Sequence, residues 1–297
     1  MNPDTPLPNP GPPKARLPAP PPGLIFVSTP IGAARDITLR ALDLLAGADV
    51  LAAEDTRSLR HLMEIHGIAL GPRPLIAYHE HNEAQALPRI LQALQEGKSV
   101  VYASEAGTPL VSDPGFGLAR AVIAADLPLT AAPGPSAALC ALTLSGLPSD
   151  RFLFAGFAPS SATARRKFLQ DLAQTQATLI LYESPKRVRE TLADLAQYFG
   201  QQRQAALCRE LTKRFEEVRR GSLGELIAAF AERDLKGEIV LVVDRAGKAE
   251  AAPETVEAAL EKAMETMSIK DAASAVAEAF GLPRRQIYQL ALQRGGK

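Results

Sequence analysis

One run in the middle of the chain constrains the fold more than any other segment. Apolar residues 99–103 are followed by Ser-Glu-Ala-Gly-Thr-Pro-Leu-Val-Ser-Asp-Pro-Gly (104–115) and then by an amphipathic pattern with helical spacing. The run predicts a strand, a tight turn fixed by two glycines and two prolines, and a helix that starts at Pro114 with Asp113 as its N-cap. A carboxylate beside glycine at the end of a strand is typical of ligand-binding loops in open α/β sheets. An ordinary strand-to-helix connection is the alternative.

The same rhythm of strand, loop and helix recurs on both sides of this run. Strands are predicted at 23–27, 49–53, 75–78, 99–103 and 127–132, and helices at 36–46, 56–66, 83–96, 114–125 and 135–145. Asp36 is expected to cap the first of these helices. Because the first strand has no polar face, we expect an α/β domain whose mostly parallel sheet is covered on both sides.

The rest of the chain divides at changes in composition. Residues 1–22 contain ten prolines and predict a disordered tail. A Gly-Leu-Pro-Ser-Asp segment at 146–150 separates an N-terminal domain (23–147) from an α+β domain with a mixed sheet (148–245). After a small polar linker, 254–297 is expected to be all-helical. Gly281 lies between its last two helices, and Arg284 and Arg285 open the last one, so this extension is either a nucleic-acid-binding helix-turn-helix or a small packing module.

Composition limits the compartment and the partners. The formal net charge is zero, so the whole chain is not drawn electrostatically to nucleic acid or to an anionic membrane. Cys140 and Cys208 stand in apolar runs, which favours buried thiols in a reducing compartment. With no apolar stretch near the ~20 residues of a membrane span and no signal-peptide core, we expect a cytoplasmic protein.

Four loops after strands are expected to meet at one edge of the first sheet, at 28–32, 53–57, 104–115 and 132–137. They carry acidic, hydroxyl and backbone groups. Neither Gly-x-x-x-x-Gly-Lys nor Gly-x-Gly-x-x-Gly is present, which disfavours ATP and weakens the case for NAD. A cofactor with ribose hydroxyls, an amino acid end and a positive centre fits these loops better, and S-adenosyl-L-methionine has all three.

The motifs in these loops resemble a known family. They are Thr-Pro-Ile-Gly (29–32), Ala-Glu-Asp-Thr-Arg (53–57), His-Asn-Glu (81–83), Glu-Ala-Gly-Thr-Pro (105–109), Pro-Gly-Pro-Ser-Ala (133–137), Gly-Phe-Ala-Pro (156–159), Tyr-Glu-Ser-Pro (182–185), Arg-Glu-Leu-Thr-Lys (209–213) and Lys-Gly-Glu-Ile-Val (236–240). In this order they are similar to the bacterial ribosomal RNA small subunit methyltransferase I family. Its members are cytidine 2′-O-ribose methylases of the tetrapyrrole-methylase-like class (class III). The match spans about 23–244, and the helical tail resembles the family's C-terminal extension.

The resemblance implies a two-domain enzyme, a homodimer, that binds S-adenosylmethionine between its domains, needs no metal, and methylates a cytidine of the assembled small ribosomal subunit. The loops and the resemblance together indicate these cofactor-binding residues: Pro30, Ile31, Gly32, Glu105, Ala106, Gly107, Thr108, Pro133, Gly134, Pro135, Ser136, Ala137, Phe157, Glu210, Gly237 and Glu238. The chain departs from the family at Glu105, where Asp is usual, and at Lys186, where His is usual.

Catalytic and RNA-binding roles have several candidates. A base for the ribose hydroxyl is sought among Glu54, Asp55, His81, Glu83 and Glu183, with water as the alternative. Asp55 also fits a helix cap, and Glu83 a first-turn acid. Candidate RNA contacts are Arg57, Arg60, His81, Asn82, Lys186, Arg187, Lys213, Arg214, Arg284 and Arg285, each of which also fits a solvated surface charge. Two other functions remain open: a tetrapyrrole-like small-molecule methylase of the same fold, and a noncatalytic ribosome-binding factor.

Overall fold

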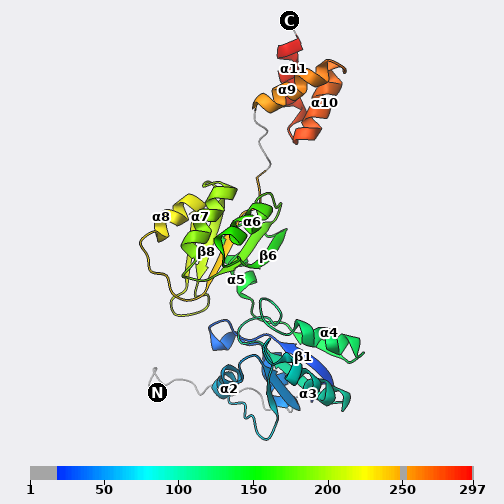
Figure 1. Ribbon diagram of the computed structural model, residues 1–297, viewed down its shortest axis with the longest axis vertical. Coiled ribbons are helices and arrows are strands. Elements are labelled where there is room, and N and C mark those ends of the chain that lie inside the picture. The colour runs from blue at the N-terminus through cyan, green and yellow to red at the C-terminus, as the bar shows by residue number, and fades with distance from the viewer. Residues whose placement is uncertain (1–18, 248–252, 296–297) are drawn as a thin grey trace, which may run out of the picture.

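The computed structural model describes residues 19–247 and 253–295, and their elements form two sheet-containing domains and a three-helix unit (Figure 1). Most of the proline-rich tail and part of the linker, residues 1–18 and 248–252, lie outside the described residues. Within the described residues, no helix is long and apolar enough to cross a membrane.

The first sheet has five parallel strands in the order β3-β2-β4-β1-β5. They are β1 (Gly23–Val27), β2 (Val50–Ala53), β3 (Leu75–Ala77), β4 (Ser99–Ala103) and β5 (Leu129–Ala132). The register pairs Val27 with both Ala103 and Ala132, and Ala53 with Ala103. Four strands therefore end level with one another, and the loops that follow them start from one edge.

Helices cover both faces of this sheet, as the fully buried apolar strands β1 and β2 require. On one face pack α1 (Leu39–Gly47) and α2 (Thr56–Ile65), and on the other α3 (Glu83–Gln95) and α4 (Phe116–Ala124). The predicted cap at Asp36 is wrong. Asp36 ends a separate 3₁₀ turn (Ala34–Asp36), and Thr38 caps α1 by accepting from the Ala41 N–H at 3.1 Å.

The second sheet is mixed, as expected, with the order β6-β7-β10-β8-β9. Its strands are β6 (Phe152–Phe157), β7 (Thr178–Glu183), β8 (Gln204–Arg209), β9 (Glu217–Ser222) and β10 (Ile239–Val243). Only β6 and β7 pair in parallel; the other pairs are antiparallel. One face is covered by α6 (Ala162–Leu172), α7 (Val188–Phe199) and α8 (Leu223–Phe230).

The opposite face of the second sheet is covered by α5 (Ala137–Ser145). Ala138, Ala141 and Leu142 of this helix pack with Ala206 and Val240 of the strands. The chain boundary expected after residue 147 therefore follows a helix that already packs with the second domain. Cys208 is buried in this cluster, whereas Cys140 on α5 is only half-buried.

The C-terminal unit consists of α9 (Pro253–Met264), α10 (Ile269–Phe280) and α11 (Arg284–Gly295) around a core of its own. Ser268 caps α10 by accepting from the Asp271 N–H at 3.2 Å. Gly281 ends α10 with a φ of +62°, as the sequence predicts.

Candidate active site

Hydrogen bonds join three of the four predicted loops at the edge of the first sheet. Thr29 and Gly107 exchange two backbone hydrogen bonds, of 2.9 and 3.0 Å. The Ser104 hydroxyl donates to the Gly107 carbonyl at 2.6 Å, and the Thr108 hydroxyl donates to the Pro135 carbonyl at 2.9 Å. The loops after β1, β4 and β5 therefore form one connected wall.

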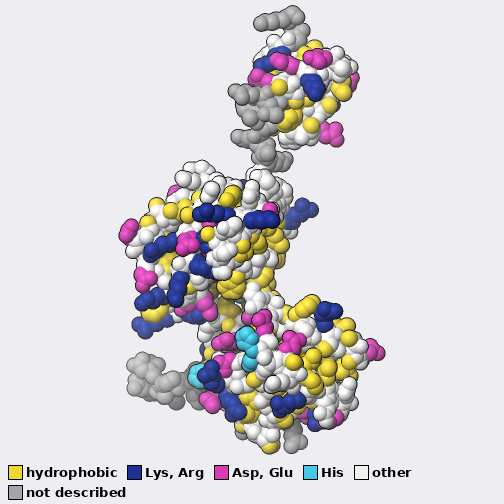
Figure 2. Space-filling view, viewed as in Figure 1, with side chains coloured by type: hydrophobic (Ala, Val, Ile, Leu, Met, Phe, Trp, Pro, Cys, Tyr) yellow, Lys and Arg dark blue, Asp and Glu magenta, His cyan; other side chains and the backbone are white. Residues whose placement is uncertain are grey.

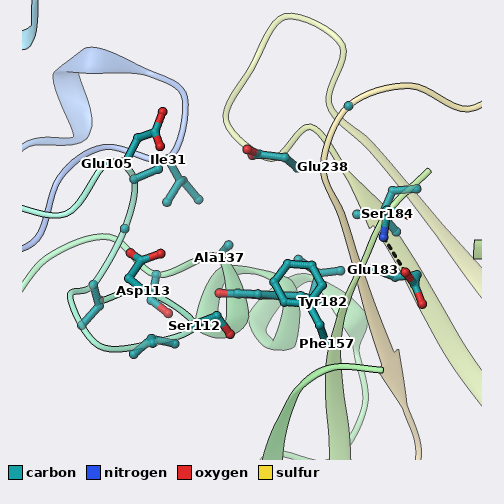
Figure 3. A pocket seen from close by; sticks show the side chains of 18 of the residues that line it. Ile31, Glu105, Ser112, Asp113, Ala137, Phe157, Tyr182, Glu183, Ser184 and Glu238 are labelled. Atoms are coloured by element: carbon teal, nitrogen blue, oxygen red, sulfur yellow. Dashed lines mark hydrogen bonds between the residues drawn. The ribbon is translucent and has the colours of Figure 1, made fainter. Parts of the chain in front are cut away.

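A cavity of about 450 Å³ opens between this wall and the second domain. From the first-domain loops and the start of α5 its lining takes Ile31, Glu54, Glu105, Ala106, Gly107, Thr108, Val111, Ser112, Asp113, Ser136 and Ala137. From the second domain it takes Phe157, Tyr182, Glu183, Ser184, Pro185, Gly237, Glu238, Ile239 and Val240. In Figure 3, Glu105 and Asp113 lie on one side of the space, and Tyr182 and Glu238 on the other.

Gly107 needs to be glycine for two reasons. Its φ is +81°, in the left-handed region that L side chains rarely adopt. A Cβ there would also lie 3.3 Å from Ile31 Cγ2, which lines the cavity. The backbone can therefore approach a ligand closely at this point.

Every charged side chain that lines the cavity is a carboxylate: Glu54, Glu105, Asp113, Glu183 and Glu238. Burial, with the nearby charge of Glu105 next in importance, raises the pKa of Glu54. Burial and the charges of Glu54 and Glu105 raise the pKa of Asp113 to about 7. A cavity lined in this way favours a positively charged occupant over an anionic one.

The predicted cap at Asp113 is wrong. The helix α4 starts at Phe116 after Gly115, and no side chain caps it. The loop before it is bent by positive φ values at Leu110 and Ser112, and Asp113 is left on the cavity lining. The sequence predicted the helix to start at Pro114. Its actual start two residues later leaves Asp113 free to line the cavity.

An aromatic side wall faces these carboxyl groups. The Tyr182 ring contacts Phe154 and Phe157 edge-on, with ring centroids 4.9 and 5.5 Å apart. Burial raises the pKa of Tyr182. Tyr182, like Asp113 and Ser112, was absent from the predicted site residues, although it begins one of the quoted motifs.

The catalytic candidates fall in different places, and His81 is exposed and outside the cavity lining. Glu54 lines the cavity, but Asp55 caps α2 and pairs with Arg57 at 3.0 Å. Glu83 is not among the lining residues; its carboxylate lies where a Cβ on Gly117, in the first turn of α4, would stand. This position favours a role for Glu83 at the positive end of that helix.

Glu183 is buried and fully engaged. Its carboxylate accepts from Thr191 Oγ1 at 2.6 Å and from the Ser184 N–H at 2.6 Å, and it pairs with Arg187 at 2.8 Å. Arg187 in turn donates to the Ala158 carbonyl at 3.1 Å. This network occupies three of the roughly four acceptor sites of the carboxylate, which favours a role in holding the loop after β7 over a role as the base.

The predicted cofactor residues form two groups. Those on the cavity lining are Ile31, Glu105, Ala106, Gly107, Thr108, Ser136, Ala137, Phe157, Gly237 and Glu238. Pro30, Gly32, Pro133, Gly134, Pro135 and Glu210 are not lining residues. Most residues of this second group belong to the loops after β1 and β5 but do not reach the cavity.

Glu210 belongs to a contact between the domains, which we call the clasp (residues 210–213 against 32–33). The Thr212 hydroxyl accepts from the Ala33 N–H at 3.0 Å. A Cβ on Gly32 would lie 2.6 Å from that hydroxyl and 3.0 Å from the Leu211 carbonyl, so only glycine fits. Lys213 bridges Glu210 and Glu238, at 2.9 Å from each.

The predicted RNA contacts also divide. Asn82 is used within its own loop, where it accepts from the His79 N–H and donates to the Ala77 carbonyl, both at 2.9 Å. Arg187 and Lys213 are held in the ion pairs above. The exposed candidates are Arg57, Arg60, His81, Lys186, Arg214, Arg284 and Arg285. Basic side chains show on all three bodies in Figure 2, with acidic ones among them. Among the described residues, no group of three or more His, Cys, Asp or Glu is placed to hold a metal ion.

Comparison with known proteins gives consistent matches. Residues 23–227 match the family described as tetrapyrrole (corrin/porphyrin) methylases, and residues 250–295 match the RsmI C-terminal HTH domain. The chain is 45% identical over 283 residues to a protein of Mesorhizobium japonicum named ribosomal RNA small subunit methyltransferase I, covering 94% of this chain and 95% of that one. A protein of Escherichia coli O157:H7 with the same name is 40% identical over 276 residues, covering 92% and 96%.

Solved structures share the fold at lower identity. A cobalt precorrin-4 methyltransferase superposes with a TM-score of 0.56 at 16% identity, over 74% of this chain and 94% of that chain. A diphthine synthase superposes with a TM-score of 0.55 at 18% identity, over 74% and 90%.

Proposed function

The chain belongs to the tetrapyrrole methylase family and, within it, to the ribosomal RNA small subunit methyltransferase I family, and from this premise we propose its reaction. It transfers a methyl group from S-adenosylmethionine to the ribose 2′-oxygen of a cytidine in small-subunit ribosomal RNA. The observation that carries the proposal is the cavity between the domains, which is lined by the family's motifs and has only carboxylates as charged groups.

The lining residues fit S-adenosylmethionine. The cofactor carries a positive sulfonium, an ammonium group and two ribose hydroxyls, and carboxylates are suitable partners for all of these. Glu105 stands beside the Gly107 backbone on the first-domain wall, and Glu238 stands on the second. Ile31, Ala137 and Val240 supply apolar surface, and Gly107 leaves room for close approach. These residues would hold the cofactor.

The chemistry asks for alignment more than for covalent help. When bound, the sulfonium supplies an already activated methyl group. The chain has to hold the 2′-oxygen in line with the methyl carbon and keep water out, and such positioning contributes several kcal/mol. The hydrogen-bonded loops after β1, β4 and β5 provide a rigid wall for this task.

We propose that the assembled small ribosomal subunit is the partner. The relatives' names support RNA of that subunit as the substrate, and the helix-turn-helix match supports a second contact through the tail. On α11, Arg284, Arg285 and Tyr288 are exposed. Around the main domains the exposed Arg60, His81, Lys186 and Arg214 are available to phosphates, whereas Arg57 has to leave its ion pair with Asp55 to reach one. A ribosomal substrate implies a cytoplasmic enzyme.

We propose further that the chain acts as a homodimer. Large apolar side chains are exposed on α4 and on the edge strand β6: Phe116 (66%), Ile123 (63%), Phe152 (45%) and Leu153 (38%). Exposed apolar side chains on an edge strand favour a protein partner. Sedimentation equilibrium tests this, with a monomer at micromolar concentration as the opposing result.

A methyl-transfer assay tests the proposed substrate. Purified protein with radiolabelled S-adenosylmethionine is expected to label the RNA of intact small subunits isolated from cells that lack this gene, at one ribose. Subunits from cells that carry the gene are the matched control and are expected to take up little label. The structural relatives named for corrin and porphyrin chemistry suggest the competing substrate. Methylation of a porphyrinogen, with no label in the subunit, would replace the RNA proposal with the small-molecule one.

A further inference from the structure

Asp113 has no structural task that accounts for its position. It does not cap α4, and its Oδ2 atom is buried without a hydrogen-bond partner among the described residues. Its side chain lines the cavity, and Figure 3 shows the carboxyl group facing the open space on the same side as Glu105. A buried polar atom without a partner costs stability, and the place of Asp113 on the cavity lining favours a role in the reaction as the explanation.

The groups around Asp113 are acidic or neutral. The negative charges of Glu54, after β2, and Glu105, after β4, raise the pKa of Asp113. The charge of Asp113 in turn raises the pKa values of Tyr102 on β4 and Tyr182 on β7. The basic groups of this region interact with those two carboxylates: His79 with Glu54, and Arg57 with Glu105. Together with burial these neighbours raise the pKa of Asp113 to about 7, so without a cofactor the carboxyl group binds a proton near neutral pH.

Resting on the proposed function, we propose that Asp113 is the proton acceptor of the methyl transfer. The 2′-oxygen forms a bond to the methyl carbon while the carbon–sulfur bond breaks and its electron pair stays on sulfur. The hydroxyl proton passes to the carboxylate of Asp113. One positive charge on sulfur and one negative charge on the carboxylate are thereby both neutralised, and the step balances without any further reactant.

The charge arrangement lets Asp113 change protonation at the right moment. A positive sulfonium in this acidic cavity lowers the pKa of Asp113, so the carboxyl group ionises when the methyl donor is bound. Once the methyl group has moved, sulfur is neutral and the pKa of Asp113 rises again, so the proton is retained. The same coupling means that binding of the charged cofactor releases a proton, whereas binding of its neutral-sulfur product does not.

Calorimetry on the full-length protein tests this without relying on activity. S-adenosylmethionine and S-adenosylhomocysteine are titrated at pH 6.0 and 7.5, in buffers of different ionisation enthalpy. With the pKa of Asp113 near 7, the affinity for S-adenosylmethionine is expected to be about eightfold weaker at pH 6.0 than at pH 7.5. At pH 6.0, nearly one proton is expected to be released per cofactor bound. The affinity for S-adenosylhomocysteine is expected to change less than about twofold.

Three variants separate the roles of the carboxyl groups. Asp113→Asn keeps the shape and is expected to bind the cofactor with no proton release, and to methylate small subunits at least about 10²-fold more slowly in single turnover. Glu105→Gln removes a neighbouring charge and is expected to shift the proton release to lower pH. Glu232→Gln, at an exposed carboxylate outside the cavity lining, is the matched control and is expected to keep the wild-type proton release.

The outcomes distinguish this inference from the proposed function. Absence of cofactor binding in wild-type protein would overturn both. Cofactor binding without proton release, or an Asp113→Asn variant that methylates at the wild-type rate, would overturn the role of Asp113 alone. If Asp113→Asn does not fold, as judged by circular dichroism, the shift in Glu105→Gln decides: an unchanged proton-release profile refutes the inference.

Discussion

Replacing Arg187 by methionine tests whether Glu183 is a structural carboxylate. The Glu183 side chain is completely buried, and the Arg187 side chain, its ion-pair partner at 2.8 Å, is 24% exposed. Methionine keeps most of the apolar stem and removes the charge. The variant therefore leaves a buried carboxylate with the Thr191 hydroxyl and the Ser184 N–H but without a cation.

The expected loss in the free energy of unfolding follows from the burial of the ion pair. Removing one partner of a buried ion pair costs about 3–5 kcal/mol, and the partial exposure of Arg187 places this pair near the lower value, at about 3 kcal/mol. The Ala158 carbonyl also loses its donor. With a urea m-value of about 3 kcal/mol/M, the unfolding midpoint is expected to fall by about 1 M.

The double variant Glu183→Gln with Arg187→Met supplies the decisive comparison. It removes both charges, so it is expected to recover at least about 2 kcal/mol relative to Arg187→Met alone. Far-UV circular dichroism is the suitable probe because the chain contains no tryptophan. Lys186→Met, at the exposed neighbouring position, is the control and is expected to change stability by less than about 0.5 kcal/mol. A loss below about 1 kcal/mol for Arg187→Met, or no recovery in the double variant, would refute the reasoning.

Three further results are expected. Gly107→Val is expected to abolish cofactor binding, measured by calorimetry, because valine is strained at a φ of +81° and comes too close to the Ile31 side chain. Gly71→Val, at a positive φ with open space around it, is the control and is expected to retain binding. Equal affinities of the two variants would contradict the place given to Gly107 on the cavity wall. Intact small subunits are expected to be methylated far faster than a short RNA oligonucleotide in the same assay, because a neutral protein depends on shape as well as charge; comparable rates would argue against this. A chain ending at Gly247 is expected to bind cofactor normally but to bind small subunits more weakly, by a factor that shrinks as the salt concentration rises. The double variant Arg284→Ala with Arg285→Ala is expected to reproduce much of that loss. Full subunit binding by the truncated chain at every salt concentration would assign the tail a packing role.

The end of the truncated chain is chosen from the structure. Ala246 is buried, and its N–H donates to the Thr175 carbonyl at 3.0 Å. Arg245 pairs with Asp150. Residues just after β10 therefore still belong to the second domain, and a cut at Asp244 would remove contacts that have nothing to do with the tail.

Sequence reasoning succeeded where the signal is local. Apolar runs that end in glycine- or proline-containing loops fixed the strands of the first sheet to within two residues. The level strand ends that bring Ile31, Gly107 and Ser136 to one cavity follow from parallel pairing alone. The cap predicted at Asp36 failed because the sequence did not show the 3₁₀ turn Ala34–Asp36 that precedes α1, so that Thr38 caps the helix instead.

Long-range packing explains what the sequence did not reveal. Glu183 was a candidate for the catalytic base because a motif contains it, but its contact with Thr191 is recognisable only once β7 and α7 are in place. Glu210 was predicted to contact the cofactor and Lys213 the RNA. In the structure they pair with each other across a turn, and both contact Glu238, 25 or more positions further along the chain. No local pattern encodes the contacts with Glu238, whereas the Glu183–Arg187 and Glu210–Lys213 pairs are i,i+4 and i,i+3 contacts that sequence reasoning overlooked.

The clasp makes one backbone amide a sensor of domain separation. The Ala33 N–H belongs to the first domain, and its acceptor, Thr212 Oγ1, belongs to the second. Since the two cavity walls come from these same domains, an opening motion that separates the domains at the clasp lengthens that hydrogen bond and admits water to the amide. Hydrogen exchange at Ala33 therefore reports the frequency of opening, and a ligand that spans both walls should slow it in proportion to its occupancy.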